Sequence, residues 1–191
     1  DPAAPPAGFA DTPAVRFQEA APRRARPPQI PGPFDTIDIG LWSLKSRWWS
    51  WRQTFGDNLV NPDIQMFVLY HSLNGNNELG ISVGMRKGRY GIVKSYARRG
   101  LQASNLVVLT HELFHVLGAS DKYVLSSGQP IHPDGYAEPD RVPLFPQRYA
   151  EIMGGQVPLG PDSAAMPKGL GQCRIGKTTA AEIGLFNLLE H

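Results

Sequence analysis

The stretch His111–Asp121, with the sequence HELFHVLGASD, carries the pattern around which the chain is expected to fold. On a helix, positions four apart lie on one face, so the imidazoles of His111 and His115 can converge on a single ion. Two neutral imidazoles at this spacing suit zinc, and a catalytic zinc site has three protein ligands and an open position for water. The stretch therefore predicts a helix that holds a metal ion.

Three further residues of this stretch complete the predicted site. Glu112 directly follows the first histidine, where it can act as general base on a water molecule. Gly118 can adopt a positive φ and end the helix, and the resulting turn would bring Asp121 back as an oxygen ligand. The alternative is a chance match on an amphipathic helix whose histidines are satisfied core residues. The added Gly and Asp argue against it, because they extend the bare H-E-x-x-H pattern.

Length and composition bound the class of protein. The chain has 191 residues, of which 41% are hydrophobic and 19% charged, as expected for one globular domain with or without an appendage. A net charge of +2 and the lack of a Lys- or Arg-rich run give no case for nucleic-acid binding. No apolar stretch approaches the ~20 residues that span a membrane. The predicted partner is a peptide or protein substrate, and the oligomeric state stays open.

The two features that bear on location are the first residue and the cysteine content. The chain begins with Asp, so we expect a processed or trimmed form, with any signal peptide or membrane anchor upstream of it. The accompanying expectation is a protein that is secreted, periplasmic or anchored facing outside the cytoplasm. Cys173 is the single cysteine, which excludes an intramolecular disulfide. It is either a fourth metal ligand that silences the site or a buried thiol, the interpretation favoured here.

Residues 1–33 differ in composition from the rest of the chain. They contain nine of the eighteen prolines and have too little apolar surface to fold alone. We interpret them as an extended arm or linker, and residues 34–191 as the catalytic domain. An arm that crosses the active-site cleft is the alternative to a linker that leads to an upstream segment.

Alternating apolar residues predict a strand at Thr36–Trp42, followed by a helix from Ser43 to about Phe55. This helix combines tryptophans with Lys and Arg, as an interfacial, membrane-touching helix would. The favoured alternative is a helix that packs its tryptophans on a sheet while its cations extend into water.

The nearly continuous apolar run Ile64–His71 predicts a central strand that is covered on both faces. Gly80–Met85 and Arg89–Ser95 are expected to form a hairpin through the turn at 86–88. An extended substrate could pair by main-chain hydrogen bonds with the first of these two strands. The predicted substrate-facing edge consists of Gly80, Ile81, Ser82, Val83 and Gly84.

Capping signals predict the bounds of two helices. Ser104 is a suitable N-cap for the metal-binding helix, expected from about Asn105 to Leu117. That helix is apolar almost all round, so it should lie at the centre of the domain. Thr179–Glu182 has the pattern of a capping box that opens a final helix to about Leu189.

The proline-rich region 122–146 is predicted to be a loop. Asp134, Glu138 and Asp140 lie within it, and a calcium site is conceivable there. A solvated acidic loop is the favoured interpretation, because the spacing matches no cation-binding loop.

A second motif adds to the first. The extended pattern at His111–Asp121 resembles the metzincin clan of zinc metalloproteases, whose usual third ligand is a histidine at the position of Asp121. The Asp variant is similar to the snapalysin type of small bacterial metalloproteases, and residues 64–190 resemble uncharacterised bacterial proteins of this clan. The sequence AEIMGG at Ala150–Gly155 resembles the Met-turn of the clan, a tight turn that places a methionine beneath the metal.

The resemblance implies an α+β zincin fold and a set of site residues. A twisted mixed sheet would be backed by two helices, and a smaller C-terminal part would carry the Met-turn and a C-terminal helix. By position, zinc would be held by His111, His115 and Asp121, Glu112 would be the base, and Met153 would be the Met-turn residue. Tyr123 and Tyr149 are nearby phenols that could contact substrate or an oxyanion. Neither stands where the tyrosine of the clan follows the methionine.

The expected function is that of a zinc-dependent endopeptidase with one catalytic ion, in which a metal-activated water attacks the peptide bond and Glu112 is the general base. An Asp ligand adds negative charge, which should leave the zinc a weaker Lewis acid than a three-His site does. One alternative is a latent or non-catalytic binding module on the same scaffold. Another is a peptidase that acts on peptidoglycan peptides.

Overall fold

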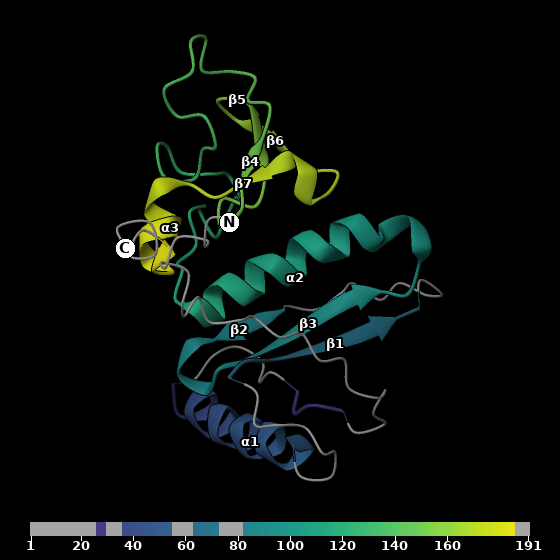
Figure 1. Cartoon of the computed structure of the whole chain (residues 1–191). Helices are drawn as coiled ribbons and strands as arrows, with labels where there is room; N and C mark the ends of the chain where they lie inside the picture. Colours follow the sequence, from purple (N-terminus) through teal and green to yellow (C-terminus); the bar gives the residue numbers. More distant parts are fainter. Residues whose placement is uncertain (1–25, 30–35, 55–62, 73–81, 186–191) are drawn as a thin grey trace, which may run out of the picture.

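A small mixed sheet lies between two helices, and a largely irregular C-terminal part covers the outer side of the second helix (Figure 1). The computed structural model describes residues 26–29, 36–54, 63–72 and 82–185. Within these residues the fold is α+β, with three α-helices, one three-stranded sheet and two two-stranded sheets. The predicted arm at 1–33 therefore lies outside the described residues except for positions 26–29.

The main sheet has the strand order β1-β3-β2. β1 (Gln65–His71) runs parallel to β3 (Tyr90–Tyr96), and β2 (Val83–Met85) runs antiparallel to β3. The strand predicted at Ile64–His71 is present as β1, but it lies at the edge of the sheet and is only partly buried, so its predicted central position is wrong; the central strand is β3. The predicted hairpin is confirmed, and the 3-10 turn η1 (Arg86–Gly88) joins its two strands. β3 is almost fully buried because helices cover both faces of the sheet (Figure 1).

The predicted strand at Thr36–Trp42 is wrong, because these residues begin the helix α1 (Thr36–Thr54). The buried residues of α1 are Trp42, Ser46 and Ser50, which recur every four positions as on one helix face. The short alternating window could not reveal this period. Nε1 of Trp42 also donates to the carbonyl oxygen of Pro28 over 3.1 Å, which ties the described end of the arm to α1.

The tryptophans of α1 do not all pack on the sheet. Trp42 belongs to a core cluster with Tyr90 and Ile92, and the ring of Trp49 lies 4.6 Å from that of Phe67. Trp48 and Trp51 are exposed. The prediction that this helix uses its tryptophans for packing is therefore wrong for half of them.

The second helix, α2 (Gln102–Leu117), is the central one, as expected from its apolar surface (Figure 1). It continues directly from a 3-10 turn, η2 (Arg99–Leu101), so Ser104 is inside the helix and the predicted N-cap is wrong. The side-chain Nδ2 of Asn105 donates to the carbonyl oxygen of Tyr96 over 2.9 Å. The side-chain Oδ1 of Asn105 accepts the backbone N–H of Tyr96 over 3.1 Å. These bonds attach the start of α2 to the end of β3.

The C-terminal part contains short elements and long loops. β4 (Ala150–Glu151) pairs in parallel with β7 (Cys173–Arg174), and β5 (Val157–Gly160) pairs antiparallel with β6 (Ser163–Ala165). A 3-10 turn, η3 (Leu170–Gln172), precedes β7. Polar side chains bridge the loops, which fits the prediction of a loop at 122–146.

The last helix, α3 (Lys177–Glu182), begins after Gly176 and makes no side-chain cap hydrogen bond. The predicted capping box is therefore wrong. The carboxylate of Glu182 bonds to residues of a distant loop, and the hydroxyl of Thr179 is buried without a hydrogen-bond partner in the described part of the chain. The expected extension to Leu189 lies outside the described residues.

Candidate metal centre

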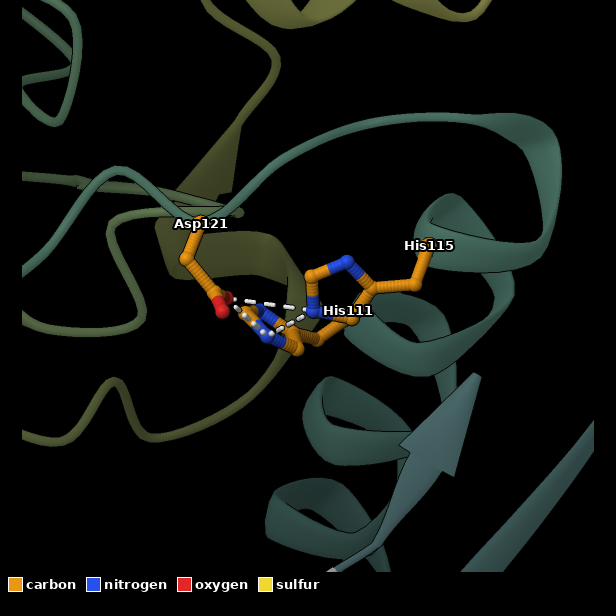
Figure 2. Close-up of side chains that lie close together, drawn as sticks. All are labelled: His111, His115 and Asp121. Carbon is orange, nitrogen blue, oxygen red and sulfur yellow. Dashed lines mark hydrogen bonds and ion pairs between the residues drawn. The ribbon is translucent and has the colours of Figure 1, made fainter. Parts of the chain in front are cut away.

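Three side chains converge at the C-terminal end of α2 (Figure 2). The Nε2 atoms of His111 and His115 are 3.1 Å apart, and they lie 3.2 and 3.1 Å from Oδ1 of Asp121. Tetrahedral bonds of the length that zinc makes to nitrogen and oxygen would separate neighbouring ligand atoms by about 3.3 to 3.4 Å. The three atoms thus form a triangle of nearly the size of one face of such a tetrahedron.

The turn that returns the chain to the site is built on Gly118. Its φ is 118°, the left-handed conformation predicted from the sequence, and its N–H donates to the carbonyl oxygens of Phe114 and His115. The N–H of Ala119 also donates to the Phe114 carbonyl over 2.9 Å. A Cβ at Gly118 would lie 3.0 Å from the guanidinium of Arg86, so the site needs glycine here for space as well as for φ.

Both histidines are oriented by backbone carbonyls. Nδ1 of His111 lies 2.9 Å from the carbonyl oxygen of Ile152, and Nδ1 of His115 lies 2.9 Å from that of Ala119. A carbonyl can only accept, so each Nδ1 carries a proton, and in the neutral form of each ring Nε2 presents its lone pair to the centre. Metal-bound histidines are usually held in this way by the second ring nitrogen.

The third member, Asp121, supplies the negative charge. Oδ1 is buried and has no well-formed hydrogen bond among the described residues, although both Nε2 atoms approach it closely. Burial would raise the pKa of Asp121, but hydrogen bonds and charge from His111 and His115 in their protonated forms outweigh it and hold the pKa below its usual range. When both rings are neutral, two lone pairs and an anionic oxygen are directed at one point, a donor set that fits a divalent cation.

Glu112 lies on the same helix, with its side chain buried beside the cluster. Burial raises the pKa of Glu112, while the two imidazoles and a hydrogen bond from the N–H of Gly84 oppose that shift. β2 approaches α2 closely at this point. A Cβ at Gly84 would lie 2.1 Å from the carbonyl oxygen of Glu112 and 2.8 Å from Cβ of His115.

The turn at Ala150–Gly155 supports the centre from the other side. The buried carboxylate of Glu151 accepts the N–H groups of Met153 (2.7 Å), Gly154 (2.8 Å) and Gly176 (3.0 Å). These bonds hold the Ile152 carbonyl in line with His111. Met153 is fully buried and packs with residues of α2 and the loop after it, in a cluster with Val107, Ala119 and Ile152.

The two tyrosines differ in position. The ring of Tyr123 lies 6.1 Å from that of His111, and burial together with the charge of Asp121 raises the pKa of Tyr123 to about 12. The ring of Tyr149 lies instead 3.6 Å from the guanidinium carbon of Arg174. Within the described residues, no hydrogen bond or ring contact joins Tyr149 to the three converging side chains.

Part of the predicted substrate edge is described. Val83 and Gly84 lie in β2, at the edge of the sheet, and the hydroxyl of Ser82 accepts the N–H of Lys94 over 3.0 Å. Gly80 and Ile81 lie outside the described residues.

A buried ion pair near the centre was not predicted from the sequence. Nζ of Lys122 donates to both carboxylate oxygens of Glu182 (2.9 and 2.8 Å) and to the carbonyl oxygen of Ser120 (3.0 Å). The N–H and the hydroxyl of Ser120 donate to the same carboxylate. This network fixes the residues on both sides of Asp121. The partners are 60 positions apart, so no local pattern could indicate the pair.

The other residues that the sequence offered as metal ligands bond to partners outside the three converging side chains. Glu138 binds Arg148 and Arg141, and Asp134 accepts the hydroxyl of Thr178 over 2.7 Å. The thiol of Cys173 donates to the carbonyl oxygen of Gly169 over 3.6 Å. Across the described residues, His111, His115 and Asp121 are the one group of three such side chains close enough to share an ion.

Comparisons with protein-family models, with curated proteins and with solved structures gave no match for this chain. Among the helices that the structure describes, none has the length and apolar character needed to cross a membrane.

Proposed function

We propose that the protein is a zinc-dependent endopeptidase that resembles the snapalysin-like members of the metzincin clan. The observation that carries the proposal is the convergence of two imidazole nitrogens and one carboxylate oxygen within 3.2 Å of one another, with both histidine tautomers set by backbone carbonyls. Chemistry of this donor set favours zinc over calcium or magnesium, which prefer oxygen ligands.

In this proposal, His111, His115 and Asp121 hold the ion. A bound zinc ion would lower the pKa of a coordinated water to about 7 and polarise the carbonyl of the substrate. Glu112 takes the proton of the attacking water and delivers it to the leaving amine. Its buried position beside β2 keeps that carboxylate next to the reacting groups and away from bulk water.

Two features of the fold support the same proposal. The edge strand β2 lies directly against α2, so an extended peptide that pairs with β2 would pass beside the centre. The turn with Met153 packs against the loop that carries Asp121, because the Lys122 N–H donates to the Met153 carbonyl oxygen over 2.9 Å. The C-terminal part thereby completes one side of the site.

The decisive experiment compares three proteins for bound zinc and for cleavage of a proteome-derived peptide library. Glu112→Gln should keep about one zinc per chain and lose about 10²- to 10⁴-fold in cleavage rate, because it removes proton transfer alone. His115→Ala should lose the zinc itself, which elemental analysis of the dialysed protein detects. Equal cleavage by the parent and Glu112→Gln would contradict the proposal and favour a binding module. Peptidoglycan peptides, assayed in parallel, distinguish the two substrate classes.

A further inference from the structure

The helix α1 has an inner face that packs on the sheet and an apolar outer face that does not. The inner face buries Trp42, Ser46 and Ser50. The outer face exposes four large apolar side chains at spacings of three, four and three positions, which place them in one row along the helix. We call this row the outer stripe of α1; it comprises Leu41 (52% exposed), Leu44 (65%), Trp48 (57%) and Trp51 (57%).

Cations border the outer stripe on both sides. At 3.6 residues per turn, Lys45 and Arg52 lie on one side of the stripe and Arg47 on the other. All three are exposed, and the guanidinium of Arg52 lies 4.9 Å from the ring centre of Trp48. Asp38 is the single acidic residue of the helix, and it lies in the first turn. The outer surface of α1 therefore combines an apolar centre with a net positive border.

Among the described residues, the position of α1 leaves this surface accessible except near Leu41, which lines one hollow with Pro28 and Gln29. α1 forms one end of the described structure, with the sheet and then α2 behind it, and the C-terminal part lies at the opposite end (Figure 1). The metal centre lies between α2 and the C-terminal part, on the far side of the sheet from α1. An occupant of the outer stripe would thus leave the centre open.

We propose that the outer stripe of α1 binds the surface of a membrane that contains anionic lipids. Tryptophan and leucine side chains enter the boundary between headgroups and acyl chains, and flanking Lys and Arg pair with lipid phosphates. Surface binding also suits a helix that is too polar on its flanks to cross a bilayer. The metal centre of the bound protein faces away from the lipid, so the proposal is independent of the proposed peptidase activity.

Intrinsic fluorescence tests this proposal directly, because all four tryptophans of the chain lie in α1. The full chain is mixed with vesicles of phosphatidylcholine alone, or of equal parts phosphatidylcholine and phosphatidylglycerol. We expect co-sedimentation and a blue shift of emission with the anionic vesicles, and weaker binding at high salt because the cations are then screened. The double variant Leu44→Ser/Trp48→Ser should bind at least tenfold more weakly.

The matched control is Leu125→Ser, which removes a more exposed leucine (81%) from a loop of the C-terminal part. It should bind vesicles as the parent does, and circular dichroism should show that both variants fold. The proposal is overturned if the parent binds neither vesicle, or if Leu125→Ser weakens binding as much as the double variant. It is also overturned if the parent forms a dimer that the double variant dissociates and no vesicle is bound, because the stripe would then join two copies of the chain.

Discussion

The α1 side of the sheet and the C-terminal part are held to the rest of the molecule by different forces. α1 packs mainly through aromatic and apolar contacts, with Trp42 in a cluster that includes Tyr90 and Ile92. One side-chain hydrogen bond, from the Ser50 hydroxyl to the Gln65 amide oxygen (2.6 Å), adds to them. The C-terminal part is held largely by buried polar groups, among them Lys122, Gln147 and Glu151. Apolar packing is non-directional, so it positions a helix but does not aim single atoms. Hydrogen bonds are directional, and the proposed metal ligands lie where α2 meets the region that uses them.

The largest expected effect comes from closing the space at Gly84. Gly84→Ala would place a methyl group 2.1 Å from the Glu112 carbonyl oxygen, so β2 or α2 must move. We expect a loss of about 3 kcal/mol in the free energy of unfolding, because overpacked backbone cannot relax. The proposed function adds the expectation that zinc binding is lost. Urea unfolding and elemental analysis measure the two effects.

The matched control is Gly40→Ala in α1, where a new Cβ meets nothing within 4 Å. It should raise the free energy of unfolding by about 0.5 to 1 kcal/mol, since alanine loses less conformational entropy in a helix. If the two substitutions change stability alike, the contrast between the tight site and the loose outer helix is wrong.

An intermediate effect is expected at the Lys122–Glu182 pair. Glu182→Leu leaves the Lys122 ammonium buried without its partner, and we expect a cost of about 2 to 3 kcal/mol. This cost is smaller than is usual when one partner of a buried ion pair is removed, because the Glu182 side chain is 28% exposed. Zinc affinity should fall about 10- to 100-fold, because the residues beside Asp121 lose their anchor.

The double variant Lys122→Met/Glu182→Leu separates charge burial from anchoring. It should recover stability to within about 1 kcal/mol of the parent, because apolar residues can replace a buried ion pair. Zinc affinity should stay reduced, since the bonds from Glu182 to Ser120 are still missing. Full recovery of zinc affinity would show that the network does not position the centre.

The smallest effect is expected at Glu138, at the outer rim of the C-terminal part. Hydrogen bonds from Arg148 lower the pKa of Glu138 to about 2. A lowered pKa in the folded state means that the carboxylate stabilises the protein above pH ~4.5, and that this contribution is lost as the pH falls toward 2. The loss should be below about 1 kcal/mol, because the Arg148 side chain is 67% exposed and water screens the pair.

Unfolding of the parent and of Glu138→Gln, followed from pH 6 to pH 2, measures this effect. The variant should be less stable near neutral pH and should converge with the parent at low pH. If the stability difference between the parent and the variant stayed constant from pH 6 to pH 2, the ion pair of Glu138 would not be its source.

Local patterns predicted the part of the site that depends on helix geometry alone. The spacing of His111 and His115 and the glycine at 118 require only neighbouring residues, and the structure has the helix and the left-handed turn where they were expected. Local patterns failed where distant contacts decide the structure. Thr36–Trp42 is helical because its buried face meets the sheet, and Glu182 bonds to Lys122 instead of closing a capping box.

The hydrogen bond from His111 to the carbonyl of Ile152 also sets an order of events during synthesis of the chain. The acceptor follows the donor by 41 positions, so at about 5 to 20 residues per second it is made roughly 2 to 8 s later. Until then the His111 ring has no partner that selects its tautomer. The nascent helix therefore carries two histidines at the right spacing while one of them is still free to present either nitrogen. If the three side chains hold an ion as proposed, the complete ligand set is therefore formed only after most of the chain has been made.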